Sequence, residues 1–184
     1  MASRHRARDL ERLFAETFSE AHGARLEGGA AEPEYLPGPP ARLRYREDYF
    51  ASALHEVAHW CIAGHRRRAL PDYGYWYIPD GRDASAQQAF EAAEARPQAL
   101  EWCFSLACGA PFRLSFDNLE AASGGARKRF EGRVLAEARR LRDGTLPPRA
   151  RSFLRALARF YGGEHELSRW GLDVALPQGG AFRP

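Results

Sequence analysis

The sequence predicts a single α+β domain in which several helices surround a small sheet of short strands. The chain has 184 residues, 45% of them hydrophobic and 12% aromatic, which suits one compact domain with its own core. Helical periodicity recurs along the chain, and its candidate strands lie close together near the N-terminus instead of alternating with helices. We expect residues 1–184 to form one domain, with irregular tails at 1–6 and 174–184.

The N-terminal region predicts one helix followed by three strands. Within the segment 8–22, apolar residues recur at helical spacing: Leu10, Leu13, Phe14 and Phe18. Gly23 then supplies a helix stop. The candidate strands are 24–27, 33–36 and 42–46. We expect Gly28-Gly29 and the proline-rich run 37–40 to separate them.

The remaining elements are mostly helices. Glu47 and Asp48 suit a first helical turn, and the segment 49–63 is apolar on most sides, as in a helix buried at the centre of a domain. Helical patterns return at 84–95, 97–108, 126–142 and 149–161. Pro97 suits the first position of its helix. The aromatic segment 72–83 predicts a strand or an extended loop that ends in a turn.

Composition excludes several classes of protein. Mean hydropathy is −0.53 and no run of about 18 apolar residues occurs, so no membrane span is expected. The charged N-terminus lacks the apolar middle of a secretory signal, which predicts a cytoplasmic protein. Three cysteines without C-x-x-C spacing are typical of buried thiols in a reducing compartment.

Basic residues are almost all arginine and occur in clusters. The net charge is +3, and Lys128 is the one lysine among 27 basic residues. The clusters lie at 66–68, 127–129 and 139–142. Guanidinium groups suit carboxylates and phosphates, so an acidic protein or RNA would be a fitting partner. A solvated, arginine-rich surface explains the same clusters equally well.

The motif His55-Glu56-Val57-Ala58-His59 carries the clearest chemical signal. On a helix, residues four apart differ by about 40° around the axis and about 6 Å along it, so both imidazoles face one space. Neutral imidazole nitrogen is a good ligand for zinc or iron. The motif therefore predicts a metal site on the helix 49–63.

Two histidines need a third protein ligand, and spacing leaves three sources open. His65 has the spacing of a third histidine after His59, but Ile62 stands where that pattern needs glycine. Glu91 and Glu94 share a face of the helix 84–95. Asp80 and Asp83 occur in the turn PDGRD.

The motif also leaves the metal and the reaction open. An H-E-x-x-H helix usually indicates zinc and hydrolysis, with Glu56 as general base for a metal-bound water. Two histidines and one carboxylate fit non-heme Fe(II) and dioxygen chemistry equally well.

Longer motifs give a specific resemblance. The stretch YFASALHEVAHWCIAGHRRR, the stretch PDYGYWYIPDGRDASAQQAFEAAEARPQALEWCF, the later FDNLE and the segment EPEYLP resemble the elongation factor P hydroxylase family. The likeness covers most of residues 8–161. It implies an oxidoreductase of the monooxygenase type, which hydroxylates the β-lysylated lysine of elongation factor P as a post-translational modification in translation. It also implies a fold similar to that of a metal-dependent endoribonuclease family of rRNA maturation.

The resemblance implies a two-histidine, one-carboxylate iron site. Its histidines match His55 and His59, and its carboxylate best matches Glu94, with Glu91 second. The family pattern does not require His65, so its presence here leaves a three-histidine site open. A single Fe(II) would be the cofactor, with zinc as the alternative, and O₂ the co-substrate. Glu56 would orient a ligand or take protons, or bond within its own helix.

Substrate contacts are a looser expectation from the same resemblance. Tyr75, Trp76 and Tyr77 would line a tunnel for an aliphatic chain, although core packing is the better explanation. Asp80, Asp83 and Glu101 would receive the amino groups of β-lysyl-lysine. The arginine clusters would steer elongation factor P, which is expected to be acidic, and no nucleic acid is required.

The sequence motifs also allow two other functions. The first is a zinc-dependent hydrolase, a peptidase or a ribonuclease, that uses Glu56 as general base. The second is a binding module without catalysis, whose basic faces contact ribosomal RNA.

Overall fold

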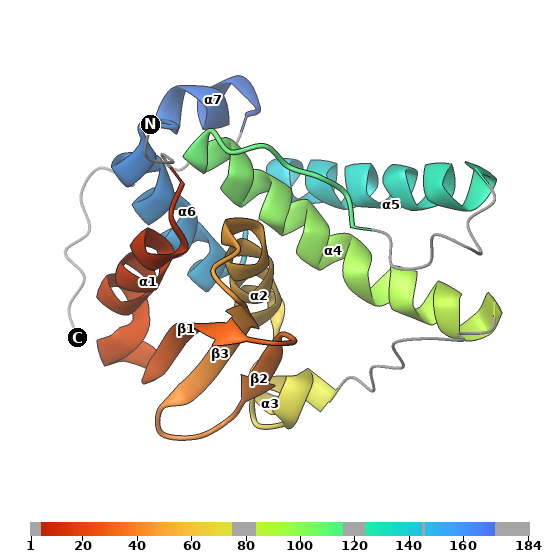
Figure 1. Cartoon of the computed structure of the whole chain (residues 1–184). Coiled ribbons are helices and arrows are strands. Elements are labelled where there is room, and N and C mark those ends of the chain that lie inside the picture. The colour runs from red at the N-terminus through yellow and green to blue at the C-terminus, as the bar shows by residue number, and fades with distance from the viewer. Residues whose placement is uncertain (1–4, 75–83, 116–123, 145, 172–184) are drawn as a thin grey trace.

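The computed structural model describes residues 5–74, 84–115, 124–144 and 146–171 and has the predicted α+β architecture (Figure 1). Its elements are α1 (Ala7–His22), β1 (Ala24–Ala30), β2 (Glu34–Leu36), β3 (Ala41–Arg46), α2 (Phe50–Ile62), α3 (His65–Arg68), the 3-10 helix η1 (Pro71–Gly74), α4 (Ala84–Cys108), α5 (Gly124–Asp143), α6 (Pro148–Tyr161) and α7 (Glu164–Arg169). The tails expected at 1–6 and 174–184 lie almost wholly outside the described residues.

Helix α1 confirms the first predicted helix. It buries the four apolar residues that the spacing selected: Leu10, Leu13, Phe14 and Phe18. The chain leaves the helix through Gly23 in the left-handed conformation (φ 55°), and the Gly23 N–H donates to the Ser19 carbonyl. This turn leads directly into the sheet.

The three strands form one mixed sheet in the order β1-β3-β2. β1 runs parallel to β3, and β2 runs antiparallel to it. The predicted break at Gly28-Gly29 is wrong, because β1 continues to Ala30 with a register shift after Glu27. Gly28 is needed for close approach: a Cβ there would lie 2.7 Å from the Tyr45 hydroxyl oxygen and from the Glu47 carbonyl oxygen.

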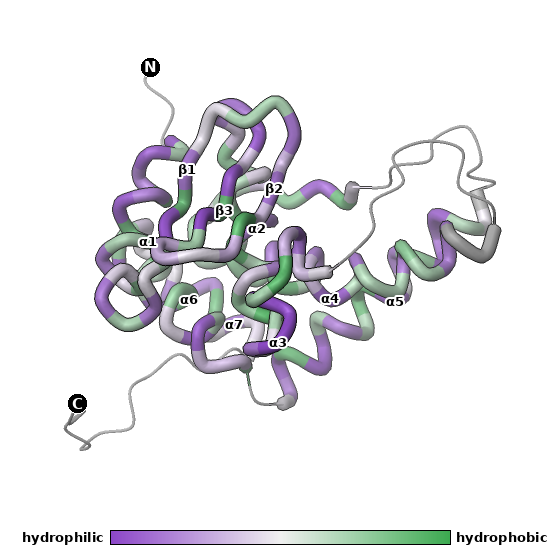
Figure 2. The backbone as a smooth tube through the Cα atoms, turned by 90° about the horizontal axis from the view of Figure 1, so that it is seen from below, coloured by the Kyte–Doolittle hydropathy of each residue, from purple (hydrophilic) through white to green (hydrophobic). Residues whose placement is uncertain are grey.

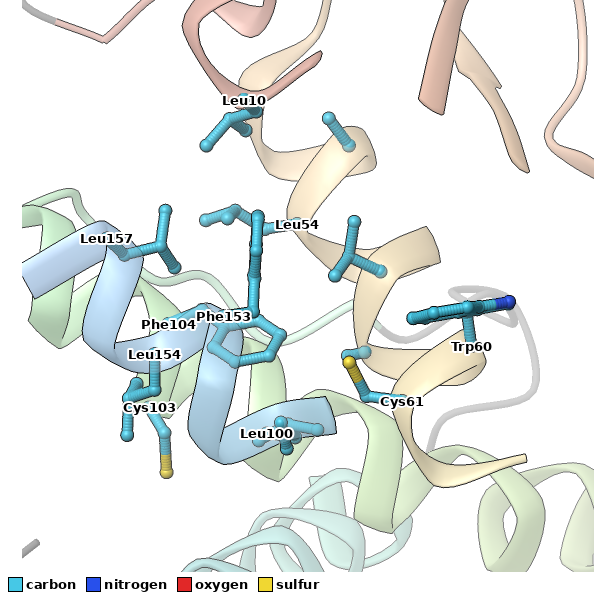
Figure 3. Packing of buried hydrophobic residues seen from close by; sticks show 14 of the residues in the cluster. Leu10, Leu54, Trp60, Cys61, Leu100, Cys103, Phe104, Phe153, Leu154 and Leu157 are labelled. Atoms are coloured by element: carbon cyan, nitrogen blue, oxygen red, sulfur yellow. The ribbon is translucent and has the colours of Figure 1, made fainter. Parts of the chain in front are cut away.

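Helix α2 runs through the centre of the domain, as the segment 49–63 predicted, but it begins at Phe50, so the expectation that Glu47 and Asp48 form its first turn is wrong. It contacts β3, α1, α4 and α6. Trp60 and Cys61 on α2 are buried, and Figure 3 shows them beside residues of α4 and α6 such as Leu100 and Phe153. All three cysteines are buried and free, as their spacing predicted.

A single long helix, α4, replaces the two helices predicted at 84–95 and 97–108. Pro97 lies inside it and not at a first helical position, so the predicted boundary is wrong. A proline inside a helix removes one backbone hydrogen bond. Here α4 contacts α2, α5, α6 and α7, and this packing keeps it continuous.

The C-terminal helices cover α4. Figures 1 and 2 both show α5 lying beside α4, and α5 and α6 confirm the helices predicted at 126–142 and 149–161. The short helix α7 was not predicted. It follows a close approach in which a Cβ on Gly163 would lie 2.0 Å from the Ala107 carbonyl oxygen of α4. Within the described residues, no helix is long and apolar enough to cross a membrane.

Candidate metal centre

His55 and His59 lie one turn apart on α2 and point to one place. Their ring centroids are 4.7 Å apart, and 3.0 Å separates their Nε2 atoms. The side chains are only 23% and 13% exposed, respectively. The helix therefore presents two ring nitrogens to one shared, mostly enclosed position.

Helix α4 supplies a carboxylate at the same position. One Glu94 oxygen lies 3.2 Å from the His55 Nε2, and the other lies 3.2 Å from the His59 Nε2. The ligand atoms of these three residues all lie within 4.8 Å of one another. Of the third ligands that spacing left open, Glu94 is the one that reaches both histidines in the described structure.

The donor set fits a divalent cation. Ligands about 2.1 Å from an ion and about 90° apart lie about 3.0 Å from one another, close to the separations found here. The two Nε2 atoms also face each other and a carboxylate, which is favourable only if a proton or a metal ion lies among them. Two histidines and one carboxylate can hold zinc or non-heme iron and leave other coordination positions open.

Glu101 holds the other nitrogen of His55. Its Oε2 lies 2.8 Å from the His55 Nδ1, and its side chain is buried. The sequence expectation had placed Glu101 at the amino groups of the substrate. The signal for its observed position was available: residues seven apart on a helix differ by only about 20° around the axis, so Glu94 and Glu101 share one face.

The electrostatics of the cluster favour a bound cation. Burial alone would lower the pKa of His55, but hydrogen bonds with Glu101 and Glu94 and their negative charges hold it well above its usual value. Burial would raise the pKa of Glu94, but the charge of His59 and hydrogen bonds with both histidines hold it well below the usual range. Without a metal, a proton on His55 takes the place of the cation.

Glu56 lies beside the cluster as a buried carboxylate. It is 8% exposed, and within the described residues no hydrogen bond or ion pair to it is found. Burial raises its pKa, while the positive charges of His59 and His55 oppose that rise. A buried carboxylate with a raised pKa beside a candidate metal site is suited to accept and return protons.

Tyr73 is a site residue that the sequence did not reveal. Its ring lies nearly parallel to that of His59, at an interplanar angle of 9°, and stacks on Tyr35 at 4.3 Å. Its hydroxyl is buried with no hydrogen-bond partner in the described part of the chain. Asp72 and Tyr73 both have positive φ, and the Asp72 carboxylate fixes this turn by accepting the Tyr35 N–H at 2.7 Å.

A pocket of about 270 Å³ opens next to His59. Its described lining comes from α2, α3, η1 and α4: His59, Ile62, Ala63, Arg67, Tyr73, Ala92, Ala93, Arg96 and Pro97. Its walls are therefore largely apolar, with two guanidinium groups among them. The pocket provides room beside the cluster for a bound molecule.

The other predicted ligands lie elsewhere. Glu91 is buried one turn before Glu94, and its carboxylate pairs with Arg133 of α5 at 3.4 Å. His65 is exposed at the start of α3 and does not belong to the cluster of ligand atoms. Tyr75, Trp76, Tyr77, Asp80 and Asp83 lie outside the described residues.

The three predicted basic clusters differ in what their arginines contact. Figure 2 shows the hydrophilic α3, which carries Arg66 to Arg68. Arg68 donates to the Ala63 carbonyl at 2.7 Å, so it caps the end of α2. On α5, Arg127 and Arg140 instead form exposed ion pairs within their own helix. The arginine clusters therefore do not share one role: Arg68 caps a helix, whereas Arg127 and Arg140 form surface ion pairs.

The fold and the cluster define a class: an α+β protein with a candidate metal site made of two histidines and one carboxylate on two packed helices. Residues 13–170 match the sequence profile of a family described as elongation factor P hydroxylase. The chain is also 38% identical over 174 residues to the elongation factor P lysine hydroxylase of Haemophilus influenzae, covering 92% of this chain and 97% of that protein. The chain belongs to the elongation factor P hydroxylase family.

Proposed function

We propose that this protein is a cytoplasmic non-heme iron hydroxylase that acts on the β-lysylated lysine of elongation factor P. The observation that carries the proposal is the cluster of His55, His59 and Glu94, whose ligand atoms lie within 4.8 Å of one another. Family membership supplies the reaction class and the protein substrate. The cluster supports a metal of the two-histidine, one-carboxylate type.

His55, His59 and Glu94 would hold the metal. Bound Fe(II) would supply the activation of O₂ and the oxidation of a C–H bond, which protein side chains cannot perform alone. The histidines come from one turn of α2, and Glu94 comes from a helix packed against it, so the ligands sit on rigid elements. A site built in this way keeps its geometry without a bound metal.

Glu56 would transfer protons to and from molecules bound beside the three metal ligands. Its carboxylate is buried and has no hydrogen-bond partner in the described structure, so it is available to a bound molecule. Its raised pKa brings it closer to working pH, where a group both accepts and donates protons effectively. In a monooxygenation the second oxygen atom of O₂ leaves as water, which consumes protons together with electrons from a reductant, and Glu56 would relay such a proton into the site.

The pocket beside His59 would admit the substrate side chain from the protein surface. Its alanine, isoleucine and proline walls suit the methylene groups of a lysine chain. Arg67 and Arg96 would keep ammonium groups away from this part of the lining and favour acidic groups of the protein substrate. The substrate contacts predicted at Tyr75, Tyr77, Asp80 and Asp83 remain part of the proposal.

Mass spectrometry of elongation factor P tests the proposal. β-Lysylated elongation factor P, incubated with anaerobically iron-loaded protein and a reductant and then exposed to O₂, should gain one oxygen on the modified lysine. His59→Ala should abolish that gain while the protein remains folded. An unmodified substrate after incubation with metal-loaded wild type would contradict the proposed activity.

A zinc-dependent hydrolase is the second candidate, and Glu56 favours it. A buried carboxylate beside a two-histidine cluster is also what activates a metal-bound water for hydrolysis. The expected likeness of the fold to an rRNA-maturation endoribonuclease points the same way. Stoichiometric zinc in protein purified without oxygen, together with cleavage of RNA or peptide that Glu56→Gln abolishes, would favour this alternative.

A further inference from the structure

Glu101 is a buried carboxylate whose described contact is with the edge of His55 that faces away from the cluster. It is 7% exposed, and its Oε2 lies 2.8 Å from the His55 Nδ1. The opposite nitrogen, Nε2, faces His59 at 3.0 Å and Glu94 at 3.2 Å. The imidazole of His55 therefore bridges two carboxylates that lie two turns apart on α4.

This contact determines which nitrogen of His55 can bind a cation. An ionised carboxylate only accepts hydrogen bonds, so the hydrogen between Glu101 and His55 is on Nδ1. A neutral imidazole then has its lone pair on Nε2, the atom that faces the cluster. The opposite tautomer would place a hydrogen on Nε2, among the other ligands, and would leave a carboxylate against an unprotonated nitrogen.

The second histidine is oriented in a different way. In the described residues, no hydrogen bond to the His59 Nδ1 is found, and the ring of His59 lies parallel to that of Tyr73 instead. The effect of a charged partner should therefore be specific to His55. Removing that partner should change His55 and leave the packing of Tyr73 against His59 unchanged.

We infer that Glu101 is a positioning residue that fixes the Nδ1–H tautomer of His55 and increases the affinity of the cluster for a divalent metal. The inference rests on the proposed metal site, and it assigns to Glu101 a role different from binding the substrate. A carboxylate on the outer nitrogen of a ligating histidine raises the basicity of the ligating nitrogen and holds the ring plane. Removal of such a partner typically weakens metal binding by roughly 10–100-fold.

Metal affinity of Glu101 variants tests the inference without any measurement of hydroxylation. Zn²⁺ and anaerobic Fe²⁺ affinities of the full chain are measured by competition with a chelator. Glu101→Ala should bind each ion roughly 10–100-fold more weakly than wild type. Glu101→Gln should lose less, because its amide oxygen still accepts the Nδ1–H while the negative charge is gone.

Glu91→Gln is the matched control, because Glu91 is a buried carboxylate on the same helix that pairs with Arg133. It should bind both ions with wild-type affinity. Thermal unfolding of the metal-free proteins identifies any variant that lost affinity through misfolding. A variant that is still folded at the temperature of the affinity measurement has lost affinity through its ligand and not through misfolding.

Nitrogen-15 NMR of the Zn²⁺-loaded protein reports the tautomer directly. Wild type should show a protonated His55 Nδ1 and a zinc-bound Nε2, and Glu101→Ala should lose the slowly exchanging Nδ1 hydrogen. A His55 protonated on Nε2, or a folded Glu101→Ala with affinity within about twofold of wild type, would overturn the inference.

The inference and the proposed function can fail separately. Weaker metal binding by Glu101→Ala, in a protein that never modifies elongation factor P, would support the inference and contradict the function. Hydroxylation by wild type with no change of metal affinity in Glu101→Ala would do the reverse. A wild type that binds neither ion would overturn both.

Discussion

Helix α2 presents two different faces to its neighbours, and the contrast separates function from stability. Toward α4 it places His55 and His59 against Glu94 and Glu101, so burial there encloses ionisable groups. On other sides it places side chains such as Leu54 and Trp60 in an aromatic and aliphatic core. Buried charges stabilise a fold poorly, whereas apolar burial is its main source of stability. Mutations on the face toward α4 should therefore lower metal affinity most. Mutations on the apolar sides should lower the free energy of unfolding and leave metal affinity unchanged.

The largest effect is expected from Glu94→Ala on the polar face. Without this carboxylate, two imidazoles remain, and metal affinity should fall by more than the roughly 10–100-fold caused by loss of an outer partner. Hydroxylation of elongation factor P should be lost in protein that is still folded at the assay temperature. Metal analysis and substrate mass spectrometry measure both.

Glu91→Ala is the matched control one turn away. Its partner is Arg133 on α5, so the variant should retain the metal. Loss of metal from Glu91→Ala alone would show that the cluster uses the other acid of this helix.

The second largest effect is expected from Phe153→Ala on the apolar side. Phe153 is fully buried and packs edge-on against Phe104, with ring centroids 5.3 Å apart. The cavity should lower the free energy of unfolding by about 3–5 kcal/mol. The folded fraction should keep its metal affinity. A loss of affinity at temperatures where the variant is folded would contradict the assignment of stability to the apolar sides of α2 and metal binding to its polar face.

Arg149→Ala should show that the end of α2 belongs to the stabilising side. The Arg149 guanidinium donates to the carbonyls of Trp60, Cys61 and Ala63, at 2.6–3.2 Å, and lies 4.8 Å from the Trp60 ring centroid. Its loss leaves helix-terminal carbonyls without this donor and should cost about 2–3 kcal/mol by chemical denaturation. Arg159 is an exposed residue on α6, the helix that also carries Arg149, and Arg159→Ala should change the free energy of unfolding by less than about 0.5 kcal/mol.

These predictions also show how much the sequence alone could foresee. Spacing predicted the buried helix and both of its histidines, because helical geometry fixes residues four apart. It left Glu91 and Glu94 open, since the register of two packed helices depends on contacts distant in sequence. Resemblance favoured Glu94, and the structure brings it to the histidines.

Other features depended on tertiary contacts that no local pattern encodes. α4 passes through Pro97 because packing along its length offsets the missing hydrogen bond. Tyr73 reaches His59 because Asp72 and Tyr73 itself both have positive φ, and although aspartate is enriched at positive φ, tyrosine there is uncommon, so no local pattern predicts this turn. Gly28 was interpreted as a break between strands, whereas glycine is required there because Tyr45 and Glu47 approach its backbone closely.

The pH dependence of stability should reveal the charges of the polar face in the metal-free protein. A raised His55 pKa gives stability that is complete below the ordinary histidine pKa and is lost as pH rises through the raised value. A lowered Glu94 pKa gives stability that is present above the ordinary glutamate pKa and is lost as pH falls through the lowered value. Metal-free protein should therefore be most stabilised by this pair between those two ordinary values.

Saturating metal should remove the alkaline part of that dependence, because the ion replaces the proton on His55. Denaturation of metal-free and Zn²⁺-loaded protein across pH measures the difference. Equal loss of stability with rising pH in both forms would contradict a shared site for proton and metal.

A smaller effect, and one of opposite sign, is expected from Tyr73→Phe, whose ring lies parallel to that of His59. A buried hydroxyl without a partner is costly, so its removal should raise the free energy of unfolding by about 1 kcal/mol. The aromatic stacking on His59 would be retained. A decrease in stability would show that the hydroxyl has a partner, and a decrease in hydroxylation alone would show that the substrate uses it.

Anomalous diffraction at the iron edge, from crystals loaded with Fe(II) without oxygen, tests the central claim most directly. The account predicts one iron peak per chain, within bonding distance of the His55 Nε2, the His59 Nε2 and a Glu94 oxygen. No peak at this cluster, or a peak bound by other residues, would contradict it.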